Sequence, residues 1–331
     1  MSKVTRLVYH IPANRDYTID LAKDLSIVNR KLHRQKMTYT VLGGQYKDSG
    51  GSSVFFKTAP HCWTTFVAIR RAFNTWRKAN RELYKKMPGL KSPKYSDFKV
   101  YLDNLHYVGT GDGYTLTPVY DTNEDGQIND SSSGSLISAP QYQGGEWNYS
   151  TLVQAKYIDP DNDGGLEIDD NADNWDMHIV GVHRGSGNRE TTEGTRYYSD
   201  YSTIGIIRSW YDSRNIPLAF DPQNMPDNVD ATRPGARLDP LSNIFDVQDD
   251  DNEMAEIVEA ENDQRPYDVN NVPGMNNNEL QLVAFVDNSA GEPDVVSVPG
   301  FQAPCGLVRV SPSGNNGAVL MLDVLTEGER I

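Results

Sequence analysis

The segment Met37-Thr38-Tyr39-Thr40-Val41-Leu42 places an apolar or aromatic side chain at every second position, and Gly43-Gly44 follows it. A period of two sends alternate side chains to opposite faces of a β-strand, and paired glycines are typical of a turn. The segment therefore predicts a half-buried strand that ends at the glycines.

Short runs of similar character recur along the chain. Long polar connections rich in Gly, Asn and Asp separate them, and helical segments do not alternate with them. This arrangement predicts an all-β fold, a β-sandwich with long loops rather than a parallel α/β sheet. The further strand candidates are Val4–Ile11, Ser53–Lys57, Phe98–Tyr107, Tyr149–Ile158, Asp176–His183, Glu279–Val286, Gly306–Val310 and Ala318–Leu325.

Two helices are expected within the connections. Thr64–Lys86 contains no Gly or Pro, and Pro88-Gly89 ends it. Tyr201–Ser213 carries apolar residues at steps of three. A weaker third candidate, Glu253–Glu261, lies in an acidic stretch. In the first helix the predicted apolar face consists of Phe66, Ile69, Phe73, Trp76 and Leu83.

The composition excludes several classes of protein. Of 331 residues, 37% are hydrophobic and 10% aromatic, and 18 tyrosines supply rings that a disordered chain lacks. Cys62 and Cys305 are too few for a disulfide scaffold or a cysteine-built zinc site. No stretch approaches about 18 consecutive apolar residues, so we expect no membrane span and no membrane partner. The start has no apolar signal-peptide core, so we expect no secretory leader.

Charge is divided unevenly along the chain. Residues 1–110 hold 20 Lys and Arg against 7 Asp and Glu, whereas the remainder holds 11 against 39, within a total net charge of −15. Such asymmetry predicts two differently charged surfaces, of which the basic one could meet a polyanion. The alternative is that the two halves contact each other.

The basic residues of Thr64–Lys86 form the first candidate site. They fall largely off the apolar face, and lysine and arginine interleaved with aromatic rings are suited to phosphates and unpaired bases. The alternative is a solvated helix face with its aromatic side chains in the core. The predicted nucleic-acid-binding residues are Arg70, Arg71, Arg77, Lys78, Arg81, Lys85 and Lys86.

Two acidic loops form the second candidate site. Each follows an Asp-x-Asn/Asp-x-Asp-Gly pattern, in which alternate oxygen-bearing residues and a tight glycine turn direct several ligands at one Ca²⁺ ion. The closing Glu at the twelfth position is absent from both loops. Neither loop is flanked by clear amphipathic helices, so an EF-hand is rejected, and plain turn formation is the alternative. The predicted calcium ligands are Asp121, Asn123, Asp125 and Gln127 in the first loop and Asp159, Asp161, Asp163, Gly165 and Asp170 in the second.

The sequence lacks the motifs of common enzymes. It contains no Gly-x-Ser-x-Gly, no His-Glu-x-x-His and no phosphate-binding Gly-Lys-Thr loop. Of the six histidines, only His178 and His183 are near neighbours, and on one strand their spacing would point them to opposite faces. We therefore expect no enzymatic activity.

The order of the segments resembles a known family. The aromatic and basic helix Trp63-Thr-Thr-Phe-Val-Ala-Ile-Arg-Arg-Ala-Phe-Asn-Thr-Trp-Arg-Lys78 precedes Tyr95-Ser-Asp-Phe-Lys-Val-Tyr-Leu102. The chain closes with Val298-Pro-Gly-Phe-Gln-Ala-Pro-Cys-Gly-Leu-Val-Arg-Val310 and Val319-Leu-Met-Leu-Asp-Val-Leu325. This layout is similar to that of the capsid proteins of small circular single-stranded DNA viruses of eukaryotes, the environmental and marine kinds especially.

The resemblance implies a single jelly-roll shell domain over residues 1–331, with long insertions at about 108–148 and 214–277. It implies that copies of the chain assemble into an icosahedral shell enclosing a single-stranded DNA genome. The protein would then occur in the virion, and in the host cell during assembly. The alternative is a secreted or cell-surface β-sandwich, lectin-like or adhesive, that binds calcium.

Overall fold

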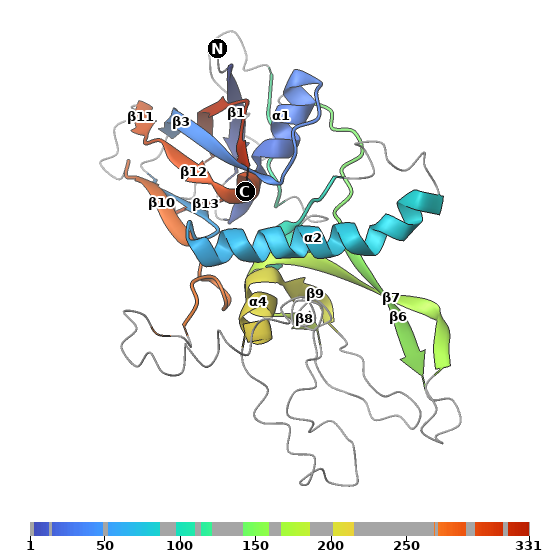
Figure 1. Ribbon diagram of the computed structural model, residues 1–331. Coiled ribbons are helices and arrows are strands. Elements are labelled where there is room, and N and C mark those ends of the chain that lie inside the picture. The colour runs from blue at the N-terminus through green and yellow to red at the C-terminus, as the bar shows by residue number, and fades with distance from the viewer. Residues whose placement is uncertain are drawn as a thin grey trace. The chain divides into compact units, whose positions relative to one another are not determined.

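Two antiparallel sheets are built from segments near the two ends of the chain, as the computed structural model in Figure 1 shows. The chain divides into two compact units. Residues 1–66, 97–149 and 279–331 form the sandwich unit, and residues 67–96 and 150–278 form the inserted unit. The structure describes residues 3–12, 15–48, 52–86, 97–109, 114–120, 142–158, 167–185, 201–214, 268, 271–288, 295–313 and 317–330.

The first sheet of the sandwich unit contains both terminal strands. β1 and β14 pair in antiparallel register along their full lengths, with Leu7 opposite Leu322, and β14 then pairs with β3. The strand order is β1 (Val4–Ile11), β14 (Ala318–Leu325), β3 (Met37–Asp48) and β11 (Val295–Val298). β12 (Phe301–Ala303) and β15 (Glu329–Arg330) also pair with β3.

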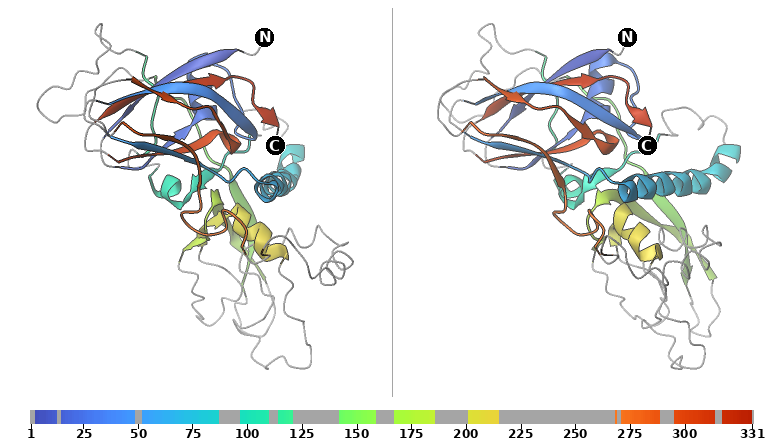
Figure 2. Two further views of the ribbon diagram at one scale, coloured as in Figure 1. Left: turned by 90° about the vertical axis from the view of Figure 1, so that its left-hand side faces the viewer. Right: turned by 60° about the vertical axis from the view of Figure 1, so that its left-hand side comes forward.

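The second sheet of the sandwich unit faces the first, as Figure 2 shows. Its strand order is β10 (Gln281–Val286), β4 (Val54–Thr58), β13 (Leu307–Pro312) and β2 (Tyr17–Asp20). All three pairings between these strands are antiparallel. Together, the two sheets confirm the prediction of a mostly antiparallel all-β architecture.

The core between these sheets follows from alternation along the strands. β14 buries every second side chain, from Ala318 to Val324, and β4 does the same with Val54 and Phe56. The core also contains fully buried aromatic residues such as Tyr9 and Tyr46, which supply large apolar areas. Several of the tyrosines whose number argued against disorder therefore lie in this core.

The strand that begins at Met37 continues past Gly43-Gly44, so the predicted end at Gly43 was wrong. β3 runs on to Asp48, and the pairing with β14 shifts by one residue between Asp323 and Val324. Gly43 has a φ of 152°, and a Cβ at Gly44 would come within 2.1 Å of the Met321 carbonyl oxygen. The glycines therefore permit a bulge and a close backbone approach rather than a turn.

Short helices connect the strands of the sandwich unit. α1 (Leu21–Asn29) begins directly after β2, and η2 (Pro304–Gly306) lies between β12 and β13. β5 (Tyr101–Asp103) is followed by α3 (Asn104–Gly109), so the predicted strand Phe98–Tyr107 was right only for Tyr101–Asp103. The Asp103 carboxylate accepts a hydrogen bond from the His106 backbone N–H at 2.9 Å, which caps α3.

The inserted unit lies between β4 and β10 in the sequence. Its sheet contains β6 (Thr151–Ile158), β7 (Glu167–Val180), β9 (Tyr201–Gly205) and β8 (Arg184–Gly185), with β7 and β9 parallel. α4 (Ile206–Arg214) follows β9 directly. The prediction of one helix over Tyr201–Ser213 was therefore wrong for its first five residues, since Thr203 and Ile204 pair with β7.

The long helix α2 (Trp63–Lys86) matches the predicted helix almost residue for residue. The expected total of two inserted helices was wrong, because the described residues contain four α-helices. None of these helices is long and apolar enough to cross a membrane. The candidate helix Glu253–Glu261 and much of the two predicted insertions lie outside the described residues, and the single shell domain stays a prediction.

Candidate nucleic-acid interface

The basic residues of α2 lie together on one side of the helix. At 100° per residue, Arg70, Arg77 and Arg81 fall within about 40° of one another, and Lys85 and Lys78 continue the same side. All five side chains are exposed, whereas Arg71 is half-buried and the side chain of Lys86 lies outside the described residues. From Arg70 to Lys85 the row spans about 22 Å along the helix axis.

The opposite side of α2 is apolar and buried, which explains why this segment is an amphipathic helix. Ala68, Ile69, Ala72, Thr75 and Trp76 are each less than 9% exposed. Ile69 and Trp76 belonged to the predicted apolar face and are confirmed in it, while Phe66 and Phe73 are half-buried and Leu83 lies outside the described side chains. The helix therefore keeps its cations in solvent while its fold is stabilised from the other side.

Aromatic rings are divided along α2. Trp76 is 6% exposed, so it is not available to stack on a base, but Trp63 in the first turn is 66% exposed. The charged face can therefore contact phosphates, and among the described tryptophans of this helix Trp63 is the one exposed enough to stack on a base.

The predicted calcium ligands cannot be placed in the fold. Asp121, Asn123, Asp125 and Gln127 lie outside the described residues, as do Asp159, Asp161, Asp163 and Gly165 and the side chain of Asp170. Among the described residues, no group of three His, Cys, Asp or Glu side chains is arranged to hold a metal ion. Calcium binding by the two loops stays a prediction.

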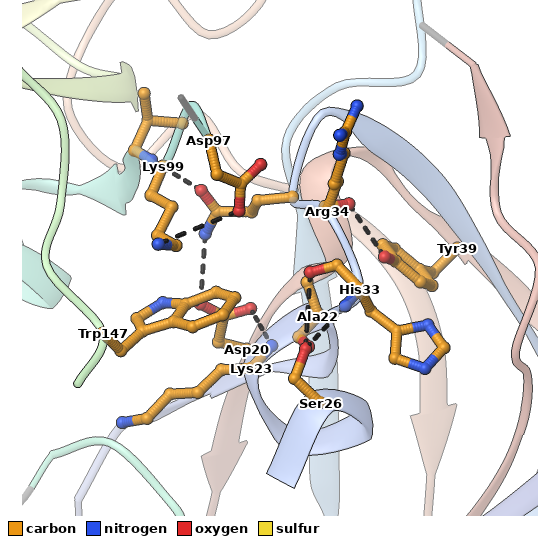
Figure 3. A network of polar contacts seen from close by, with 12 residues as sticks. Asp20, Ala22, Lys23, Ser26, His33, Arg34, Tyr39, Asp97, Lys99 and Trp147 are labelled. Atoms are coloured by element: carbon orange, nitrogen blue, oxygen red, sulfur yellow. Dashed lines mark hydrogen bonds and ion pairs between the residues drawn. The ribbon is translucent and has the colours of Figure 1, made fainter. Parts of the chain in front are cut away.

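A buried polar network at the start of α1 was missed by sequence reasoning (Figure 3). Asp20 is fully buried and caps α1 by accepting a hydrogen bond from the Lys23 N–H at 3.1 Å. Its second oxygen accepts from the Gln35 side-chain amide and from the Trp147 indole, each at 3.1 Å. An Asp that directly precedes a run without Gly or Pro is a helix-start signal, and it could have predicted this cap.

Burial changes the proton affinity of the acids in this network. It raises the pKa of Asp20 to about 6, against the opposing effect of the hydrogen bond from Lys23. Burial also raises the pKa of Asp97 to about 6, and the neighbouring Lys99 ammonium, 3.8 Å away, opposes it. The network therefore contains two carboxyl groups that titrate near pH 6 rather than near pH 4.

A second buried cluster surrounds His106. The His106 Nδ1 atom accepts a hydrogen bond from the Leu102 N–H at 3.0 Å, so the ring proton lies on Nε2, 3.2 Å from the Tyr149 hydroxyl. Burial, with a smaller contribution from the Arg309 charge, lowers the pKa of His106 to about 3. Arg309, 3% exposed, forms an ion pair with Asp103 of β5. These groups order the interior of the sandwich unit, where His106 and Arg309 are buried.

The two neighbouring histidines do not share one strand. β7 ends at Val180, before His183, so the expectation of opposite strand faces was wrong. His178 is buried with its Nε2 atom 3.1 Å from the Val182 carbonyl oxygen. The Nε2 atom of His183 lies 3.5 Å from the Asp212 carboxylate, while its Nδ1 accepts from the Gly205 N–H. These contacts join β9, α4 and the end of β7 within the inserted unit.

Comparison with protein-family models, curated proteins and solved structures found no match for this chain. The functional proposal therefore depends on the chain's own strand order, charges and side-chain geometry.

Proposed function

We propose that this chain is the capsid protein of a small circular single-stranded DNA virus. Copies of it assemble into an icosahedral shell around the genome, and it has no enzymatic activity. It acts in the virion and, during assembly, in the host cell.

The nested pairing of eight strands carries this proposal. Leaving aside the short strands β12 and β15, the strands of the two sheets are, in chain order, β1, β2, β3, β4, β10, β11, β13 and β14. The first pairs with the last, the second with the seventh, the third with the sixth and the fourth with the fifth, all antiparallel. This nesting supports a jelly roll, the double Greek-key sandwich that viral shell domains and lectins use.

The basic face of α2 favours a shell protein over the lectin-like alternative. A neutral glycan gives no reason for a row of exposed cations, whereas a packaged polyanion requires one. The chain is acidic overall, with a net charge of −15, so this row of cations is opposite in sign to the net charge of the chain. The calcium-binding surface sandwich depends on the two acidic loops, and no described residue favours it.

The cations of α2 bind DNA through phosphates. Phosphate contacts carry no sequence information, so binding is independent of sequence and falls steeply as salt rises. In the assembled shell this face points to the interior. Each acidic loop binds Ca²⁺, or the two together neutralise charge at a subunit contact, because carboxylates brought together repel unless a cation lies between them.

Particle formation tests this proposal. The full chain is expressed, purified by size-exclusion chromatography and imaged by negative-stain electron microscopy. We expect uniform closed particles or the small oligomers from which they form. A chain that stays monomeric at high concentration, with and without Ca²⁺ and single-stranded DNA, would overturn the shell proposal and favour the surface module.

A further inference from the structure

A groove of about 830 Å³ lies along α1 in the sandwich unit and plays no part in the helix α2 interface. Its lining comes from α1 and the residues just after it, from Tyr120 and from the segment that ends at Trp147. Its size is within the range of sites that take small molecules or parts of larger ones.

Cations predominate among the described residues that line the groove. Lys23, Arg30 and Lys31 bring three positive charges, and Glu146 brings one negative charge. Arg30 and Lys31 are exposed, and neither forms an ion pair with another described residue. Such a groove attracts an anionic ligand.

Aromatic residues also line the groove. Tyr120 is 61% exposed and meets Tyr142 edge to face, with ring centroids 5.2 Å apart. The Trp147 indole is fixed on its polar side by the hydrogen bond to Asp20, and the Lys99 ammonium lies 4.5 Å from its ring centroid. Figure 3 shows the Lys23 side chain beside the Trp147 ring, so a cation and an aromatic surface adjoin.

We propose that this groove binds a short segment of single-stranded DNA. The phosphates lie against Lys23, Arg30 and Lys31, and unpaired bases stack on Tyr120 and Trp147. This inference rests on the proposed function, because that function supplies the ligand class, and it adds a second contact of a different kind from α2.

The combination of cations and rings favours single strands over other polyanions. A duplex keeps its base faces stacked inside, so the tyrosine and tryptophan would gain nothing from it. A sulfated glycan would pair with the cations, but its saturated rings lack the flat π-faces of bases. The groove is therefore expected to prefer oligo-dT to duplex DNA and to heparin fragments of similar charge.

Two variants separate the two kinds of contact. In the full chain, Arg30→Asn with Lys31→Ala removes two phosphate contacts, and Asn tolerates the left-handed φ of 50° at Arg30. Tyr120→Ala removes one exposed stacking surface. Lys3→Ala with Lys57→Ala makes the same charge change outside the groove and serves as the control.

Fluorescence anisotropy with labelled oligo-dT of about 10 nucleotides measures the outcome at several salt concentrations. The Arg30/Lys31 variant is expected to reduce the slope of log K against log salt by about 1.4, because each single-strand phosphate contact contributes about 0.7. Tyr120→Ala is expected to weaken binding about tenfold with the slope unchanged, because stacking is not ionic. The control should match the wild type in both respects.

Three results would count against the groove, and they differ from failure of the proposed function. Wild-type affinity in both groove variants, with affinity lost on Arg77→Ala, Lys78→Ala and Arg81→Ala, would leave α2 as the DNA contact and overturn the groove site. An equal loss of oligo-dT affinity in the control variant would show that the groove residues act only through the overall charge of the chain. Tight binding of heparin fragments that is insensitive to Tyr120→Ala would assign the groove to glycans. No oligo-dT binding by the wild type at low salt would instead overturn the proposed function itself.

Discussion

The sandwich unit and the helix α2 use charge in opposite ways. Inside the sandwich, Asp20, Asp97 and Arg309 are buried, and each has polar or charged partners. On α2, Arg77 and Arg81 are exposed and make no ion pair with another described residue. A buried charge must be compensated where it lies, whereas an exposed charge is free to meet a ligand. The comparison predicts that the first group governs stability and the second governs binding.

Removing Arg309 should have the largest effect on stability. Arg309→Met leaves the Asp103 carboxylate, 16% exposed, without its cation inside the sandwich unit. Breaking a buried pair in this way costs about 3 kcal/mol of unfolding free energy, the lower end of the usual range because Asp103 is not fully buried. Urea denaturation measures it. A loss below about 1 kcal/mol would show that this buried charge is no more important than a surface one.

His106 should give the next largest effect, and one that depends on pH. Its pKa is about 3 in the folded chain and near 6.5 when unfolded, so the unfolded chain takes up the proton first as pH falls. The stability that neutral His106 contributes is complete above pH 6.5 and is lost progressively below it. From pH 7.5 to pH 5 this loss is about 2 kcal/mol. The advantage of wild type over His106→Asn should shrink by that amount, measured by urea denaturation at both pH values.

Asp20 should give the opposite dependence of stability on pH, so it serves as the control for His106. Its raised pKa means that the folded chain keeps a proton that the unfolded chain has released, so its contribution is complete below about pH 4 and is lost as pH rises towards 6. Relative to Asp20→Asn, the wild type should lose stability on raising the pH through this window. The same direction for both variants would show that the titration belongs to other groups.

The exposed ion pair between Arg6 and Asp323 should matter little. Two hydrogen bonds of 2.8 Å join these side chains, and the Arg6 guanidinium lowers the pKa of Asp323. The Arg6 side chain is nevertheless 56% exposed, and solvent screens such pairs. Arg6→Ala is expected to cost about 0.5 kcal/mol in thermal denaturation, and a cost above about 2 kcal/mol would remove the distinction between buried and exposed charges.

The smallest stability effect is expected on α2 itself. Arg77→Ala, Lys78→Ala and Arg81→Ala together leave the buried side with Ile69 and Trp76 intact, and alanine favours helix. The melting temperature should match that of Asn74→Ala, a change at another exposed position of the helix. A large drop would mean that the basic row has a structural role rather than a binding role.

Sequence reasoning succeeded where one local pattern decides the structure. β14 and α2 were predicted nearly to the residue, because strict alternation along Ala318–Leu325 and a long run without Gly or Pro allow few other structures. Sequence reasoning failed where a strand that is distant in the sequence but adjacent in the fold decides the local structure. The strand β9 forms because Thr203 and Ile204 pair with β7, and Gly43 becomes a bulge because β14 lies against Gly44.

The candidate sites divide in the same way. The basic row of α2 was visible as composition on a helical period, so its exposed members could be named in advance. The groove could not be predicted from the sequence, because Lys23 and Trp147 are far apart in the sequence and come together only in the folded chain. Asp20 carries a helix-cap signal, but nothing local indicates that Gln35 and Trp147 donate to it.

Sedimentation of purified particles, recorded at nucleic-acid and protein absorbance together, tests the central claim most directly. We expect the wild type to sediment as closed shells containing nucleic acid. The variant with Arg77, Lys78 and Arg81 replaced by Ala should form shells of the same protein mass with less nucleic acid. Wild-type protein that sediments only as monomers, or variant shells with the wild-type content of nucleic acid, would contradict it.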